Sequence, residues 1–170
     1  MNFESWLAKL LGQKKHEVQH LLADQTALHF LIAWSLLESK CFNGYVKVDH
    51  LDRFSKRIVE KESFDTATIS KAASHFHARY QDKAKYKHLM YKQDSPKMTS
   101  ILQQSFSSLQ PYEMVFLVAL TVYRFRNNIF HGNKGVDSWL NYKQQIDYCI
   151  DAMQAFINNA ESINPSLLIA

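Results

Sequence analysis

The stretch that begins at Pro111 constrains the fold of this chain more than any other feature. Its middle would be apolar on nearly every side of a helix, since it runs Met114, Val115, Phe116, Leu117, Val118, Ala119, Leu120 and, after Thr121, Val122. A helix of that kind belongs in the interior of a protein, and proline suits the position that opens a helix. Residues 112–130 are therefore predicted to form a helix in the middle of a bundle.

The composition favours an all-α fold. The chain has 170 residues, of which 46% are hydrophobic, which is enough for one packed domain and too many for a disordered chain. Only four Gly and three Pro occur, whereas β-sandwiches and barrels need many turn residues. Residues 1–170 are therefore predicted to form one all-α domain, a bundle of about six or seven helices around the apolar central helix.

Periodicity and capping residues divide the rest of the chain. Gly12 is expected to end a first short helix, and Asp137 is expected to cap the last one. Ala27, Leu31 and Trp34 are expected to face inward from the second helix. The expected helices cover residues 3–11, 17–40, 49–61, a long stretch from Asp65 to about Tyr91, a helix from Pro96, 112–130 and 138–162.

Neither the cysteines nor the N-terminus indicates an exported protein. Cys41 and Cys149 are too few for a disulfide framework and are expected to lie in the core. The N-terminus lacks the pattern of a signal peptide, and the longest apolar run, residues 114–120, is too short to cross a bilayer. The sequence therefore favours a cytoplasmic protein.

No cofactor and no metal are expected. His16, His20 and Asp24 have the spacing of metal ligands on one helix, but polar residues on a solvated face often have the same spacing. The solvated face is the preferred interpretation.

One cluster of candidate catalytic residues follows the apolar stretch. It consists of two arginines, two asparagines and a histidine: Arg124, Arg126, Asn127, Asn128 and His131. Residues four apart lie about 40° from each other around a helix, so Asn127 and His131 would share a face beside Arg126. His suits general acid–base catalysis near neutral pH, and the planar fork of Arg matches phosphate oxygens. The cluster therefore favours chemistry on a phosphate group.

The string Arg126-Asn127-Asn128-Ile129-Phe130-His131-Gly132 resembles the signature of the HEPN superfamily, in which a polar residue follows an Arg and a His stands a short distance further on. The resemblance implies a metal-independent endoribonuclease that cleaves RNA by attack of the 2′-OH, with Arg126, Asn127 and His131 as catalytic residues. It also implies a homodimer that joins two such motifs, and a role as a toxin or in antiviral defence under an inhibitory or regulatory protein partner.

Two further residues are candidates for a supporting role. Arg124 also precedes His131 at a spacing that the signature allows, so either arginine could hold the phosphate. Glu38 could orient Arg126 from the second helix, or it could be an ordinary carboxylate near the end of that helix.

Positive charge is concentrated in one segment. Residues 71–97 contain seven Lys and Arg residues and two acids, a net charge of +5, so the remainder of the +4 chain carries −1. Lys83, Lys85, Lys87 and Lys92 could follow an RNA backbone while interleaved tyrosines stack on bases. A solvated lysine face with the tyrosines packed inward is the equally weighted alternative.

Two alternatives to a nuclease remain at the level of sequence. Cations in the last turn of a helix stabilise its dipole, and Gly132 is an ordinary residue to follow a helix, so the motif could be accidental. The chain could also be a HEPN module that binds a partner or nucleic acid without catalysis.

Overall fold

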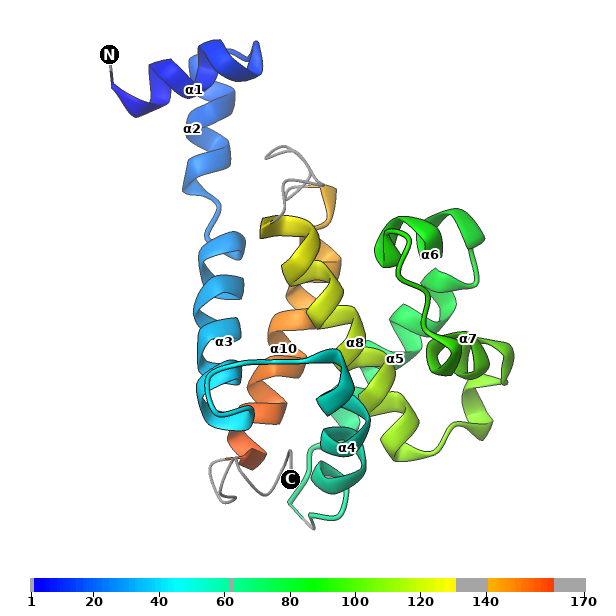
Figure 1. Ribbon diagram of the computed structural model, residues 1–170. Helices are drawn as coiled ribbons and strands as arrows, with labels where there is room; N and C mark the ends of the chain where they lie inside the picture. Colours follow the sequence, from blue (N-terminus) through cyan, green and yellow to red (C-terminus); the bar gives the residue numbers. More distant parts are fainter. Residues whose placement is uncertain (1, 62, 131–140, 161–170) are drawn as a thin grey trace.

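The computed structural model describes residues 2–61, 63–130 and 141–160 (Figure 1). Over these residues the regular structure is helical, which confirms the predicted all-α bundle. The elements are α1 (Phe3–Leu11), α2 (Lys15–Ala23), α3 (Thr26–Cys41), α4 (Val48–Ile58), α5 (Thr66–Tyr80), α6 (Lys83–Met90), α7 (Pro96–Gln103), the 3₁₀ turn η1 (Phe106–Ser108), α8 (Pro111–Phe130) and α10 (Lys143–Ala160). Among the described residues, no helix has the length and apolar character that crossing a membrane requires.

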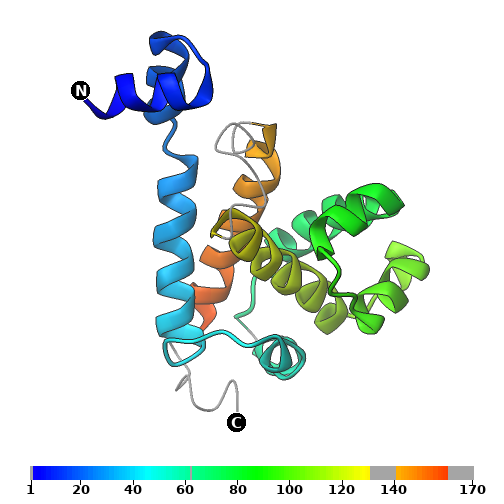
Figure 2. The ribbon, with the colours of Figure 1, turned by 45° about the horizontal axis from the view of Figure 1, so that its top comes forward.

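Helix α8 is the centre of the bundle, as its apolar surface predicts. Val115, Leu117, Val118 and Leu120 are fully buried. Helices α4, α5 and α10 pack against α8, and α6 and α7 lie along it on the side away from α3 (Figures 1 and 2). Each fully buried Val or Leu contributes about 1.5–3 kcal/mol, so this helix carries much of the stability of the fold.

Two of the helices predicted from periodicity are divided in the structure. The stretch 17–40 is broken at Asp24, whose Oδ1 accepts a hydrogen bond from the Thr26 backbone N–H at 2.8 Å. The stretch from Asp65 to Tyr91 is broken at Asp82, which accepts from the N–H groups of Ala84 and Lys85 at 2.9 and 3.2 Å. Aspartate competes with the helical backbone for its own hydrogen bonds. Asp82 is the N-cap of α6, whereas Asp24 follows the end of α2 and holds the turn into α3 through its bond to Thr26.

The ends of the other helices agree with the capping residues. Gly12 follows α1 with φ of +65°, a left-handed conformation that favours glycine, and Ser95 caps α7 before Pro96. The last helix is described over Lys143–Ala160, and the predicted cap Asp137 lies outside the described residues. Cys41 and Cys149 are both fully buried, as expected.

Helices α1 and α2 form an N-terminal arm. They bury Leu7, Ala8 and Val18 against each other, with Leu11 packed alongside, in a cluster separate from the main core. The arm stands beyond the first residues of α3, with α2 nearly in line with α3 and α1 lying across the end (Figures 1 and 2). The bundle therefore has a small projection at one end.

Helix α3 is apolar on two sides. Phe30, Ala33, Trp34 and Leu37 face the core, and α3 packs along α10. The prediction that Leu31 faces inward was wrong: Leu31 is on the exposed side, three residues before the buried Trp34. Both sides of this helix are apolar, so periodicity alone could not identify the side that the core covers.

Candidate functional site

The last turns of α8 bring polar side chains out of an apolar core. Arg124 and Asn128 are buried, whereas Arg126 and Asn127 are partly exposed. Arg124 and Asn128 are four residues apart and share the side of the helix that faces the α6–α7 connection. Arg126 extends to the other side, toward α3. The structure therefore separates the two arginines that the sequence leaves as alternatives.

Arg124 is used inside the fold. Its guanidinium donates hydrogen bonds to the Gln93 side-chain oxygen and, at 3.3 Å, to the Gln93 carbonyl oxygen, and it lies 5.7 Å from the Tyr123 ring. Burial lowers the pKa of this guanidinium, but Arg remains protonated at any physiological pH. An arginine held in this way is a structural cation rather than a ready phosphate ligand.

Asn128 also holds the connection between α6 and α7. Its side-chain amide donates to the Leu89 carbonyl oxygen at 3.1 Å. Between Leu89 and Gln93 the backbone turns through Tyr91 and Lys92, which adopt φ of +44° and +65°. Non-glycine residues rarely adopt this left-handed conformation, so the connection needs the support that Arg124 and Asn128 supply.

Arg126 is the arginine that remains at the surface of the site. Its Nη1 donates to the Asn127 side-chain oxygen at 3.1 Å, and its guanidinium lies 5.6 Å from the centre of the Trp34 ring. Trp34, on α3, is buried and packs against Tyr123 of α8 with ring centroids 6.3 Å apart. The ring and the amide limit the positions that the Arg126 fork can take, while part of the side chain stays open to solvent.

Trp34 is the residue that the sequence did not indicate as part of the site. Cation–π contacts depend on which helices pack together, so nothing in the pattern around Trp34 singled it out. Its only signal was a prediction that it faces inward, which the structure confirms.

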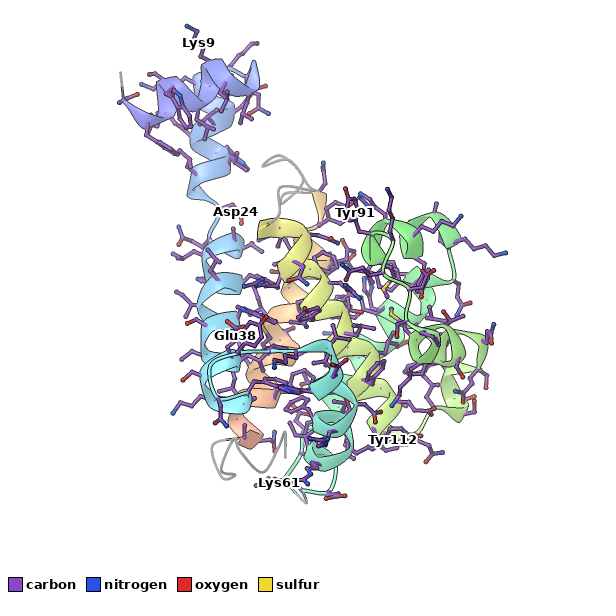
Figure 3. All side chains as sticks on the ribbon, in the orientation of Figure 1. Lys9, Asp24, Glu38, Lys61, Tyr91 and Tyr112 are labelled. Carbon is purple, nitrogen blue, oxygen red and sulfur yellow. The ribbon has the colours of Figure 1, made fainter. Side chains whose placement is uncertain are left out.

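Glu38 has a different contact from the one considered for it. Its carboxylate accepts a hydrogen bond from the Val46 backbone N–H at 3.4 Å, across the turn that leads from α3 to α4. Asn43 and Gly44 in that turn have φ of +54° and +90°. Figure 3 labels Glu38 on the second half of α3, where it can hold this turn in place.

His131, the predicted acid–base residue, lies outside the described residues, as does Gly132. Of the predicted catalytic set, the structure therefore describes Arg126 and Asn127 and places them in direct hydrogen-bond contact.

The four predicted RNA-binding lysines, Lys83, Lys85, Lys87 and Lys92, are all exposed. Lys83 and Lys87 line a groove of about 550 Å³ between α6 and α7, which Asp94 and the hydroxyl groups of Thr99 and Ser100 also line. Lys85 is paired with Asp82 at 3.4 Å.

Of the tyrosines near these lysines, some are packed inward and one is open for stacking on a base. Tyr80 is buried in the core, and burial raises the pKa of its hydroxyl. Tyr86 is half-buried, and its hydroxyl lies 3.1 Å from the Thr99 hydroxyl. Tyr91 is exposed beside α6 (Figure 3), so it is the tyrosine that can stack on a base.

The set with metal-ligand spacing is divided by the break before α3. His16 and His20 are exposed on α2, whereas Asp24 is hydrogen-bonded to Thr26 and paired with Lys143 at 3.4 Å. Across the part of the chain that the structure describes, no three His, Cys, Asp or Glu side chains are grouped as a metal ion would require.

Comparison with known proteins gives this chain no relative: no family model, no curated protein and no solved structure matches it.

Proposed function

We propose that this protein is a metal-independent endoribonuclease. The observation that carries the proposal is the placement of Arg126, which is held by Asn127 and Trp34 at the end of α8 and is still partly exposed. A positioned guanidinium offers paired donors to the oxygens of a phosphodiester and stabilises the charge that develops when phosphorus is attacked. The resemblance of residues 126–132 to the HEPN signature supports the same reading.

The reaction uses the 2′-OH of the RNA itself. His131 acts as the base that takes the proton of this hydroxyl, whose oxygen then attacks the adjacent phosphorus. The bond from phosphorus to the 5′ oxygen breaks, which leaves a 2′,3′-cyclic phosphate and, after protonation, a 5′-OH. Arg126 contacts the phosphate oxygens, and Asn127 orients Arg126. DNA lacks the 2′-OH and is not a substrate.

The exposed lysines of α6 and its following turn supply the binding surface for RNA. Lys83 and Lys87 line the groove between α6 and α7, and Tyr91 is exposed at the end of α6. Lysines that neutralise phosphates strengthen binding without reading sequence, and an exposed aromatic ring adds stacking. Arg124 and Asn128 link this surface to α8, since they hold the segment from Leu89 to Gln93.

The resemblance also supplies the biological setting of the proposal. A toxin or antiviral ribonuclease in the cytoplasm acts as a homodimer and is restrained by a regulatory protein partner until needed. One observation favours a second candidate, a HEPN-like module that binds without cleaving. Arg124 and Asn128, two of the polar residues at the end of α8, serve the fold rather than a substrate.

The test is cleavage of total RNA and tRNA by the purified protein in excess EDTA. We expect the wild-type protein to cleave RNA to products with a 2′,3′-cyclic phosphate, and single-stranded DNA to stay intact. Arg126→Lys keeps the charge but loses the paired donors, so the rate should fall about 100-fold. His131→Ala should abolish cleavage, and Lys40→Ala, an exposed change on α3, is the control.

Two outcomes contradict the proposal. A folded wild-type protein that cleaves none of the RNAs would favour the binding module. Cleavage that depends on added metal and survives in both Arg126→Lys and His131→Ala would show that these residues are not the site.

A further inference from the structure

The outward side of α3 is an uncovered apolar surface. Leu28 and Ile32 are 50% and 51% exposed, and Leu31 and Leu36 are exposed beside them. Ile32 and Leu36 also line a groove of about 390 Å³ between α3 and α10, together with Ile150 and Ile157 of α10. A helix that is apolar on both sides is normally covered on both sides, so this surface is suited to a partner.

The N-terminal arm has a second apolar surface. Phe3, Trp6 and Leu10 are 59%, 48% and 65% exposed. Their spacing of three and four residues places them on one side of α1, and the Phe3 and Trp6 rings lie 5.5 Å apart. This apolar strip is separate from the side of α1 that packs on α2 through Leu7 and Ala8.

These two surfaces belong to one chain but are held apart in it. The turn between α2 and α3 is fixed by Asp24, which accepts from the Thr26 N–H at 2.8 Å and is paired with Lys143 of α10 at 3.4 Å. Figure 3 labels Asp24 at this joint, and Figure 2 shows the arm extended beyond α3. The joint keeps the strip beyond the end of α3, whereas the groove runs along the side of that helix.

The borders of the two surfaces carry opposite charge. Lys9 is three residues after Trp6 and lies next to the strip on α1. On α10, the exposed Asp147 and Asp151 lie on the same side as Gln154 and Asn158, which line the groove. An apolar strip bordered by Lys9 therefore suits an apolar groove bordered by two carboxylates.

We infer that the arm of one copy binds the α3–α10 groove of a second copy of this chain. The strip of Phe3, Trp6 and Leu10 covers the apolar side of α3, and Lys9 approaches Asp147 and Asp151. Each chain has one arm and one groove, so a two-fold exchange satisfies both surfaces in a closed dimer. This interface is independent of ribonuclease activity, because none of its residues belongs to the proposed site.

The contact is tested by cross-linking two differently tagged chains. One carries Leu10→Cys and the other Ile32→Cys, and they are coexpressed so that mixed dimers form. The native thiols do not compete, since Cys41 and Cys149 are fully buried and burial raises the pKa of both, to about 12 for Cys41. A short bis-maleimide should join the two tagged chains.

The matched control pairs Leu10→Cys with Ser74→Cys, an exposed position on α5. This pair should give no cross-link between the chains. The inference is overturned if the Leu10→Cys and Ile32→Cys chains do not cross-link, or if the control pair cross-links equally well.

Light scattering after gel filtration gives a second, independent readout. The wild-type protein should have twice the 19.8 kDa mass of one chain. Ile32→Glu and Trp6→Glu each place a charge in the contact and should raise the dissociation constant about 100-fold. Ser74→Glu adds the same charge elsewhere and should leave the dimer intact, and circular dichroism checks that all three variants are folded.

A dimer that persists in both the Ile32→Glu and the Trp6→Glu proteins overturns the inference, because it must form through other surfaces. A wild-type protein with the mass of one chain overturns the inference. A dimer that Ile32→Glu dissociates but Trp6→Glu does not would mean that the α3 surfaces pair without the arm, which also overturns it. RNA cleavage is measured separately, so an intact dimer without activity would reject the proposed function and leave this interface standing.

Discussion

Two arginines only two positions apart on α8 have different environments. Arg124 points to the α6–α7 connection and donates to Gln93, while Arg126 lies over Trp34 and donates to Asn127. Two positions along a helix correspond to a rotation of roughly 200°, so neighbouring arginines of this kind cannot serve the same surface. One is therefore assigned to stability and the other to the proposed chemistry.

This assignment predicts a change in stability for Arg124→Ala. The substitution removes the hydrogen bonds to Gln93 and releases the turn in which Tyr91 and Lys92 have positive φ. Hydrogen bonds from a charged donor contribute about 1.5–3 kcal/mol, so the free energy of unfolding should fall by that amount. Urea denaturation followed by circular dichroism measures it.

Lys87→Ala, an exposed change on the neighbouring α6, is the control and should alter the free energy of unfolding by less than about 0.5 kcal/mol. An Arg124→Ala protein as stable as this control would show that the Gln93 contact contributes nothing to the fold.

At the scale of elements, single aspartates decide where helices end. The central helix 112–130 was predicted to within one residue, because the stretch is apolar almost throughout and Pro111 marks its start. The breaks at Asp24 and Asp82 were missed, because the hydrophobic period continues across both positions. The carboxylates of Asp24 and Asp82 accept backbone N–H groups that a continuous helix would use, and periodicity does not register this competition.

The candidate site was predictable only in part for a related reason. Arg126 and Asn127 are adjacent in sequence, so their contact follows from local geometry. Trp34 and Gln93 reach the end of α8 from α3 and from the α6–α7 connection. Which helices pack on the last turns of α8 depends on the whole fold, so neither partner could be inferred from the sequence around the motif.

The joint at Asp24 predicts a dependence of stability on pH. Hydrogen bonds from Thr26, its side chain first and then its backbone N–H, and the charge of Lys143 lower the pKa of the Asp24 carboxyl. A carboxyl whose pKa is lower in the folded state stabilises that state fully above its unfolded pKa, about 3.9. The contribution is lost as the pH falls from there through the lower pKa of the folded state.

Asp24→Asn should therefore be less stable than the wild-type protein at neutral pH, with a difference that shrinks in acid. Thermal unfolding measured from neutral pH to below pH ~3 would show the two proteins converging. Glu60→Gln, which changes an exposed carboxylate after α4, is the comparison and should follow the wild-type curve. A difference between Asp24→Asn and wild type that stays constant down to the lowest pH would show that the charge of Asp24 does not stabilise the fold.

At the scale of the whole molecule, charge and apolar surface are separated. Residues 71–97 carry +5 while the remainder of the chain carries −1, and α6, with its exposed lysines, lies on the opposite side of α8 from α3 (Figure 1). The apolar surfaces belong to α3 and the arm. A dimer formed through α3 and the arm would therefore leave the basic side of each copy open to a nucleic acid.

This separation predicts the salt dependence of RNA binding. Each lysine that neutralises a phosphate of a single strand contributes about 0.7 to the slope of log affinity against log salt concentration. Lys83→Gln with Lys87→Gln should reduce the slope by about 1.4, whereas Lys40→Gln with Lys47→Gln, exposed lysines near the end of α3, should not change it. Fluorescence anisotropy with a labelled single-stranded RNA, in an inactive His131→Ala background over a series of KCl concentrations, measures both slopes. Equal slopes for the two double variants would show that RNA does not bind along the α6–α7 groove, because the electrostatic contribution of a lysine depends on its distance from the phosphates.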